Sequence, residues 1–200
     1  MKYERHEYFE IKIEKLQSNS NLWNQTIAYA NNCSWNVGRH LAKLLEQDDF
    51  QDFEGVFIAL SGNNIIGFCT FRETDYYPEN RYFPWISSIF VDEEYRGNRI
   101  SEKLIQSAIN NARMFGFDKV YIPSNIIGLY EKYGFCKIDE LENYDGDIDN
   151  IFMKKYKTKA LEKPISNAFL IVHHNLHQLL FSVKFNPNKS ISYFNEIGGK

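Results

Sequence analysis

The stretch PWISSIFVDEEYRGNRISEKLIQSAINNARMFG, residues 84–116, decides the fold of this chain. Its first part is an apolar, partly β-branched run between a proline and three acidic residues, which predicts an interior strand. Its last part repeats apolar residues at helical spacing, with Gly116 as the predicted stop. The apolar residues of both parts are Ile86, Ile89, Phe90, Val91, Ile100, Leu104, Ile105, Ala108, Ile109 and Ala112. The stretch therefore predicts a buried strand, a tight basic turn and an amphipathic helix.

The turn itself, Arg96-Gly97-Asn98-Arg99-Ile100-Ser101, has the features of an anion site. A turn that opens a helix leaves backbone N–H groups unpaired at the positive end of the helix dipole. Such a group of donors most often holds a phosphate. Arg96 and Arg99 add positive charge, and Ser101 adds a hydroxyl donor. An alternative is an ordinary surface turn, because Arg-Gly turns before helices are common.

A second run, SNIIGLYEKYGF at residues 124–135, follows another short predicted strand at residues 119–122. Its LYEKYGF part predicts a short helix, in which Gly134 ends the helix in a left-handed conformation. Phe135 then starts the next strand in the core. Tyr130 could be an amphipathic tyrosine at the edge of that helix.

Together the two runs resemble the Gcn5-related N-acetyltransferases (GNAT), and the resemblance covers about residues 1–156. That family carries Arg/Gln-x-x-Gly-x-Gly/Ala at the strand-to-helix turn, where it holds the pyrophosphate of acetyl-coenzyme A. Arg96 within VDEEYRG fits the pattern. Arg99 stands where the family usually has its first glycine, and Ser101 where it has a second small residue. The resemblance implies an α/β fold with a twisted mixed β-sheet flanked by helices.

The resemblance also implies the residues that bind the coenzyme. Pantetheine is expected to pair with the backbone of residues 89–91 as an added strand. A backbone N–H near Phe90 and Val91 would stabilise the oxyanion. Tyr130 would lie beside the coenzyme A sulfur and serve as the acid. The complete expected set is Ile89, Phe90, Val91, Arg96, Gly97, Asn98, Arg99, Ile100, Ser101, Asn125 and Tyr130.

The sequence offers two carboxylates as candidates for the general base. Residues 74–83 (TDYYPENRYF) are predicted to form a loop, and in the resembling fold that loop would overhang the acetyl-transfer site. Glu73 and Asp75 are the best placed carboxylates. Many members of the family keep a glutamate in the central strand, whereas this chain has Ser87 and Ser88 there. Asp75 as a capping residue of its own loop, or a base that acts through water, are the alternatives.

The rest of the chain predicts the remaining elements of that fold. Alternation predicts a strand over residues 8–16, and polar turns frame a hairpin of residues 54–60 and 65–73. Helices are expected over residues 22–30 and 37–46, and two closing strands over 135–141 and 151–156. Trp23, Tyr29 and Trp35 cluster at the joint of the two helices, where they either pack the core or line the acceptor pocket.

Composition narrows the class of protein. The chain has 200 residues, 44% of them hydrophobic, and a net charge of −3 with no basic cluster, which argues against a nucleic-acid partner. No apolar run is long enough for a membrane span, and the polar start is not a signal peptide. Three cysteines without Cys-x-x-Cys spacing predict core residues in a reducing, cytoplasmic compartment.

Residues 157–200 are expected to be an extension beyond the catalytic domain of residues 1–156. An apolar stripe from Ile165 to Val183 predicts a helix, which should dock on the domain or on a second copy in a homodimer. His173 and His177 stand one turn apart, but no acidic residue or cysteine joins them, so no metal is expected.

The sequence thus predicts an acetyl-coenzyme A-dependent N-acetyltransferase that acts on a small-molecule or peptide amine by direct attack. The alternative is a non-catalytic domain that senses acyl-coenzyme A and regulates a partner. The identity of the amine is not encoded in any motif found here.

Overall fold

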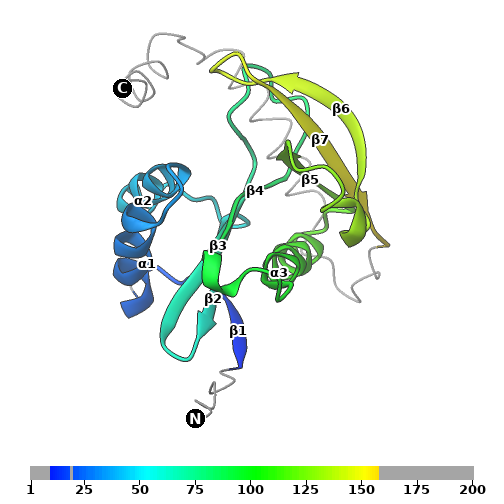
Figure 1. Ribbon diagram of the computed structural model, residues 1–200. Coiled ribbons are helices and arrows are strands. Elements are labelled where there is room, and N and C mark those ends of the chain that lie inside the picture. The colour runs from blue at the N-terminus through cyan, green and yellow to red at the C-terminus, as the bar shows by residue number, and fades with distance from the viewer. Residues whose placement is uncertain (1–9, 19, 158–200) are drawn as a thin grey trace. The chain divides into compact units, whose positions relative to one another are not determined.

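Seven strands form one mixed sheet in the order β1-β2-β3-β4-β5-β7-β6. The computed structural model describes residues 10–18 and 20–157 (Figure 1). The strands are β1 (Ile11–Lys15), β2 (Gly55–Ser61), β3 (Asn64–Arg72), β4 (Trp85–Val91), β5 (Lys119–Ser124), β6 (Cys136–Glu142) and β7 (Ile148–Lys155). The helices are α1 (Asn21–Asn32), α2 (Val37–Gln47) and α3 (Ile100–Met114), with 3₁₀ turns η1 (Glu93–Tyr95) and η2 (Glu131–Tyr133). This is the mixed α/β sheet flanked by helices that the sequence predicts.

The helices cover the two faces of the sheet separately. Figure 1 shows α1 and α2 on one side of β2–β4 and α3 on the other. Alternating side chains of the strands point to opposite faces, so each face has its own apolar cluster. Ile86 of β4 packs in the cluster that contains the apolar face of α3, whereas Phe90 packs in the cluster beneath α1 and α2.

Strands β4 and β5 run parallel but pair at only one register position of the described chain, Trp85 opposite Tyr121. The amide of Tyr121 also donates to the carbonyl of Pro84 at 3.0 Å. Beyond these first residues the two strands share no further ladder positions. The side of β4 that faces β5 therefore has a gap in the ladder along the rest of the strand.

A β-bulge interrupts β4 in its middle. Thr70 of β3 pairs with Ser87, and Phe68 pairs with Phe90, so Ser88 and Ile89 together stand opposite one residue of β3. Ser88 takes a left-handed backbone conformation with φ of 49°. A bulge re-aims the side chains beside it and often lies next to an active site. The sequence predicts a continuous strand here, and the serine pair gives no separate sign of the bulge.

The observed ends of the elements differ from the predicted ones by a few residues. The β2–β3 hairpin closes through Gly62 and Asn63, because Ser61 pairs directly with Asn64. Strand β6 extends to Glu142, and strand β7 begins at Ile148. The turn between them is therefore shorter than the predicted polar turn between residues 141 and 151. The predicted extension helix and the His173–His177 pair lie outside the described residues. Within the described ranges, no helix is long and apolar enough to cross a membrane.

Candidate active site

The turn between β4 and α3 is held by its own backbone and side chains. Gly97 has φ of 84° and Arg99 has φ of 56°, so both positions are left-handed. Asn98 donates its side-chain amide to the carbonyl of Tyr95 at 3.1 Å, which ties the turn to η1. The positive φ at this position explains why a glycine would fit here, because glycine adopts such a conformation without steric cost. Arg99 adopts the same conformation with a side chain.

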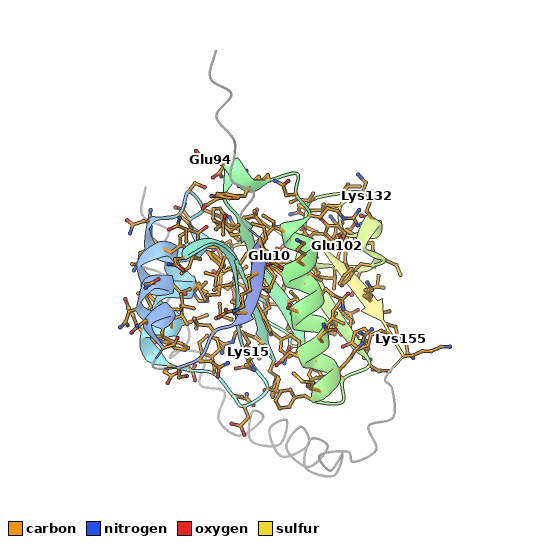
Figure 2. The ribbon with its side chains drawn as sticks, turned by 90° about the horizontal axis from the view of Figure 1, so that it is seen from below. Glu10, Lys15, Glu94, Glu102, Lys132 and Lys155 are labelled. Carbon is orange, nitrogen blue, oxygen red and sulfur yellow. The ribbon has the colours of Figure 1, made fainter. Side chains whose placement is uncertain are left out.

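The first turn of α3 leaves backbone donors outside the helix ladder. The first amide bonded back along this helix is that of Lys103, which donates to the carbonyl of Arg99 at 3.2 Å. The N–H groups of residues 100–102 precede that bond and lie at the positive end of the dipole. In Figure 2, Glu94, Glu102 and Lys132 lie towards this end of α3, and Lys15 and Lys155 towards the other.

Both arginines of the turn are paired with neighbouring carboxylates. Arg96 lies 2.6 Å from the Glu93 carboxylate and donates Nε to the carbonyl of Val91 at 3.0 Å. Arg99 donates to Glu102 at 2.8 Å. Both arginine side chains are more than half exposed, and ion pairs at the surface contribute little to stability. Either guanidinium can therefore exchange its carboxylate for a phosphate at small cost.

The remaining residues of the turn anchor it to the core and to η2. Ile100 is buried among the residues that pack α3 against the sheet. The hydroxyls of Ser101 and Tyr133 are hydrogen-bonded at 3.0 Å, which links the start of α3 to η2. Gly134 ends η2 in the left-handed conformation, as the sequence predicts. The two runs that carry the family resemblance are thus in direct contact.

Tyr130 lies in the core just before η2. Its side chain is 5% exposed and its ring contacts those of Tyr133, Phe135 and Phe152. Burial raises the pKa of Tyr130 to about 12, and a hydrogen bond with Ser124 opposes that rise. The hydroxyl therefore keeps its proton at neutral pH, which suits a proton donor rather than a base.

The side-chain amide of Asn125, a predicted coenzyme ligand, is bound to β7. Its nitrogen donates to Asp149 at 2.9 Å, and its oxygen accepts from the side chain of Asn150 at 3.1 Å. With both ends of the amide occupied, Asn125 stabilises the end of β5. Contact with a coenzyme would fall to its backbone.

Asp75 and Glu73, the two predicted bases, have different surroundings. The Ser87 hydroxyl of β4 donates to Asp75 Oδ2, and the amide of Tyr76 donates to Asp75 Oδ1 at 2.7 Å. Burial raises the pKa of Asp75. Glu73 instead accepts from the side chain of Gln51 at 2.8 Å, in the segment after α2. The structure brings Asp75, and not Glu73, to the central strand.

The loop of residues 74–83 is fastened to β6 and β7 by tyrosine hydroxyls. Tyr77 donates to Asp149 at 3.0 Å and Tyr82 donates to Asp139 at 2.8 Å. Tyr77 also stacks on Trp85. Sequence reasoning did not predict that Ser87 meets Asp75 or that Tyr77 meets Asp149, because these contacts join residues 12 and 72 positions apart.

The candidate acid and base lie on opposite faces of the sheet. Tyr130 and Ile86 belong to the cluster on the α3 face. Ser87 follows Ile86 on the strand, so its side chain points to the other face, where Asp75 meets it.

The three aromatic residues at the α1–α2 joint divide between the two expected roles. Trp23 donates its indole N–H to the carbonyl of Leu45 at 3.2 Å, and Tyr29 packs edge-on against Phe68, so both pack the core. Trp35 is 39% exposed and stacks on Phe90, which is the residue directly after the bulge. Trp35 is therefore the member of the group that can line a pocket.

No metal cluster accompanies this arrangement. Within residues 10–18 and 20–157, no group of three or more histidine, cysteine, aspartate or glutamate side chains is placed to hold a metal ion.

Comparison with known proteins identifies the family and the fold. The chain matches the family described as the acetyltransferase (GNAT) family over residues 21–135. A GNAT-family structure from Desulfovibrio desulfuricans superposes with a TM-score of 0.55 at 13% identity, over 73% of this chain and 99% of the other. A GNAT acetyltransferase from Elizabethkingia anophelis with acetyl-CoA bound gives 0.51 at 18% identity, over 72% and 97%.

A chain of the NatC complex, solved with a Gag peptide and CoA, gives a TM-score of 0.53 at 16% identity, over 74% of this chain and 99% of the other. No curated protein matches the sequence. At these identities the structures establish the shared fold, and the family match covers more than half of the chain. The chain therefore belongs to the GNAT family of acetyltransferases.

Proposed function

We propose that the chain transfers the acetyl group of acetyl-coenzyme A to an amine by direct attack. The observation that carries this proposal is the gap between β4 and β5, which ends at the open first turn of α3. A gap in a ladder accepts an extended, amide-rich ligand, and an open helix N-terminus accepts a phosphate. Pantetheine followed by a pyrophosphate has both features in this order.

The residues expected to hold the coenzyme lie along that path. Residues 89–91 would offer backbone groups to pantetheine, and the turn from Arg96 to Ser101 would hold the pyrophosphate. Because Arg96 and Arg99 are paired with Glu93 and Glu102, we expect the backbone N–H groups to supply most of the specificity. The guanidinium groups would add attraction once they turn to the phosphates.

The chemistry would depend mainly on positioning. The amine nitrogen attacks the thioester carbonyl, the C–S bond breaks, and the products are an amide and a thiol. An N–H of β4 near Phe90 would stabilise the developing oxyanion. The attacking nitrogen gives up one proton to a base, and the leaving sulfur takes one from an acid.

Asp75 and Tyr130 are the proposed base and acid. Asp75 is supported by its hydrogen bond to Ser87 on the central strand, whereas Glu73 is bonded to Gln51. Tyr130 is supported by its burial on the opposite face, where its hydroxyl keeps its proton at neutral pH. Two separate groups let one accept a proton from the attacking nitrogen while the other gives a proton to the leaving sulfur.

We propose a small-molecule or peptide amine as the acceptor. A similar chain belongs to the NatC complex, which was solved with a Gag peptide and CoA, and this supports a peptide as one candidate acceptor. We also infer that the catalytic domain spans residues 1–156, that residues 157–200 are an extension that docks on it or forms a homodimer, and that the protein acts in the cytoplasm. Nucleic acid and membranes are not expected as partners.

Release of free thiol from acetyl-coenzyme A, measured with a panel of amines, tests the proposal. The panel should include polyamines, aminoglycosides, amino acids and peptides with free N-termini. We expect thiol release with at least one class, together with a mass increase of one acetyl group on the amine. Tight coenzyme binding without turnover on any class would favour the sensor instead.

A further inference from the structure

We propose that the hydroxyl of Ser87 accepts the proton of the attacking amine and passes its own proton to Asp75. This inference rests on the proposed acetyl transfer and names the group that contacts the amine. Ser87 would then be a catalytic residue, and Asp75 would act through it. The pair would take the place of the glutamate that the central strand lacks.

The contacts of Asp75 are the first argument. One carboxylate oxygen accepts the Tyr76 amide at 2.7 Å, and the other accepts the Ser87 hydroxyl. Both oxygens are therefore engaged, and the side chain is half-buried. Each carboxylate oxygen keeps a further lone pair, so these two bonds orient Asp75 without saturating it and hold the Ser87 oxygen against it. The oxygen of Ser87 keeps lone pairs that the bond to Asp75 does not use.

The position of Ser87 is the second argument. It is the last residue of β4 in regular register before the bulge, where it pairs with Thr70 of β3. The bulge itself, at Ser88 and Ile89, begins the segment proposed to hold pantetheine and the thioester. Ser87 is thus next to the reacting carbonyl along the strand, on the face away from Tyr130.

The charges around Asp75 make it able to receive a proton. Burial and the nearby carboxylate of Asp149 raise the pKa of Asp75, while the bonds from Ser87 and Tyr76 and the charge of Arg72 lower it. The net direction is upward. Tyr77 also faces this group, and its own pKa is raised by burial and by the charges of Asp75 and Asp149.

The proposed step balances in protons and bonds. As the C–N bond forms, the nitrogen loses one proton to Ser87 Oγ, and Ser87 Oγ–H gives its proton to Asp75 Oδ2. Ser87 ends the step neutral, and Asp75 ends it protonated. The C–S bond then breaks, and Tyr130 supplies the proton of the thiol. Exchange with water returns Asp75 and Tyr130 to their starting states.

Four variants test the relay, once wild-type thiol release is established with an active amine. Ser87→Ala and Asp75→Asn should each lower kcat by about 10²-fold, within the range of a placed acid or base. The double variant should be no slower than either single one, because both break the same path. Ser87→Thr keeps a hydroxyl and should retain most of the activity. Thr70→Val, which removes the hydroxyl of the cross-strand neighbour, is the matched control and should keep the wild-type pH profile.

The pH dependence separates a relay from a merely structural role. In the wild type, kcat should fall at low pH as Asp75 becomes protonated. The part of that fall set by Asp75 should disappear in both Ser87→Ala and Asp75→Asn, which leaves only the dependence set by protonation of the amine. The dissociation constant of coenzyme A, measured by calorimetry, should stay unchanged. A Ser87→Ala enzyme with wild-type kcat, or losses that multiply in the double variant, would overturn the relay.

If Ser87→Ala does not fold, Ser87→Thr decides the question. Activity near that of the wild type supports the relay, and a loss as large as that of Asp75→Asn contradicts it. A wild type that releases no thiol with any amine would instead overturn the proposed function.

Discussion

The two sides of the candidate site are built in different ways. The proposed phosphate side is one continuous turn, residues 92–101, whose expected donors are backbone N–H groups and whose side-chain bonds are mostly local. The acceptor side joins residues from separate segments through the side chains of Asp75, Ser87, Tyr77 and Asp149. One side depends on the conformation of a single segment, and the other on contacts between segments.

This difference predicts different responses to mutation. The exposed ion pairs of Arg96 and Arg99 are individually weak, so loss of one should affect binding only moderately. The half-buried bond between Ser87 and Asp75 holds a group with a raised pKa, so its loss should affect turnover strongly. Mutations on the phosphate side should change the affinity for coenzyme, and those on the acceptor side should change kcat.

The largest effect is expected from Tyr130→Phe. The substitution removes one hydroxyl and little volume from a side chain that packs on three rings, so folding and coenzyme binding should persist. We expect turnover at saturating substrate to fall by about 10²–10⁴-fold, the usual contribution of a placed acid.

Tyr156→Phe is the matched control for that prediction. Tyr156 is also a buried tyrosine, and its hydroxyl has no hydrogen-bond partner in the described part of the chain. Turnover should therefore be unchanged. Equal rates for wild type and Tyr130→Phe would remove Tyr130 from the mechanism without affecting the fold.

Asp75→Asn should lower turnover at neutral pH by about 10²-fold, and more than Glu73→Gln does. Asp75 reaches the central strand, whereas Glu73 bonds to Gln51. Raising the pH should restore activity, because the amine then loses its proton without help. Rate profiles of both variants from acid to alkaline pH are the measurement, and a larger loss in Glu73→Gln would reverse the assignment.

The same variant should separate activity from stability. Because burial raises the pKa of Asp75, the folded protein binds this proton more tightly than the unfolded chain does. The stability that this group contributes is therefore present at low pH and is lost as pH rises through the raised pKa. At neutral pH, thermal melts should show that Asp75→Asn keeps its stability while it loses turnover.

Arg99→Gly should have a smaller effect than the preceding variants. It should raise the stability of the protein and weaken its binding of the coenzyme. A non-glycine residue at φ of 56° costs about 1 kcal/mol, so glycine should raise the free energy of unfolding by about 0.5–1 kcal/mol. Loss of the charge should weaken coenzyme binding by about ten-fold or less. Denaturant titrations and calorimetry report the two quantities separately, and tighter binding would mean that Arg99 only replaces a family glycine.

The smallest effect on turnover is expected from removal of residues 157–200. The described strands and helices end by Lys155, and Tyr156 is buried with its amide bonded to Asp118 at 2.9 Å. The cut must therefore follow Tyr156, and kcat should change by less than about two-fold. Sedimentation and thermal melts then show whether the extension docks on its own domain, which lowers the melting temperature, or on a second copy, which changes the assembly. A large loss of kcat would place part of the site in the extension.

The phosphate side could be predicted from the sequence because its signals are local. Gly97 and the charges of the turn lie beside an apolar helix pattern, and the structure has a turn with left-handed residues directly before α3. The bulge at Ser88 could not be predicted, because a serine with φ of 49° has no marker in its neighbours. The Asp75–Ser87 bond depends on how the loop of residues 74–83 folds back, which tertiary contacts of Tyr77 and Tyr82 decide. The side-chain partners of Asn125 could not be predicted for the same reason, since they lie on β7, about 25 residues away in the sequence.

Calorimetric titration of acetyl-coenzyme A into Gly97→Val tests most directly whether the β4–α3 turn is the coenzyme site. Gly97 has φ of 84°, and a Cβ there would meet nothing within 4 Å, so valine disturbs the backbone conformation rather than the packing. Gly146→Val is the control, because Gly146 has the same φ in the β6–β7 turn with only Glu142 nearby at 3.9 Å. We predict that Gly97→Val weakens binding by at least about ten-fold while Gly146→Val binds as the wild type does. Wild-type affinity in Gly97→Val would contradict the assignment and place the coenzyme elsewhere.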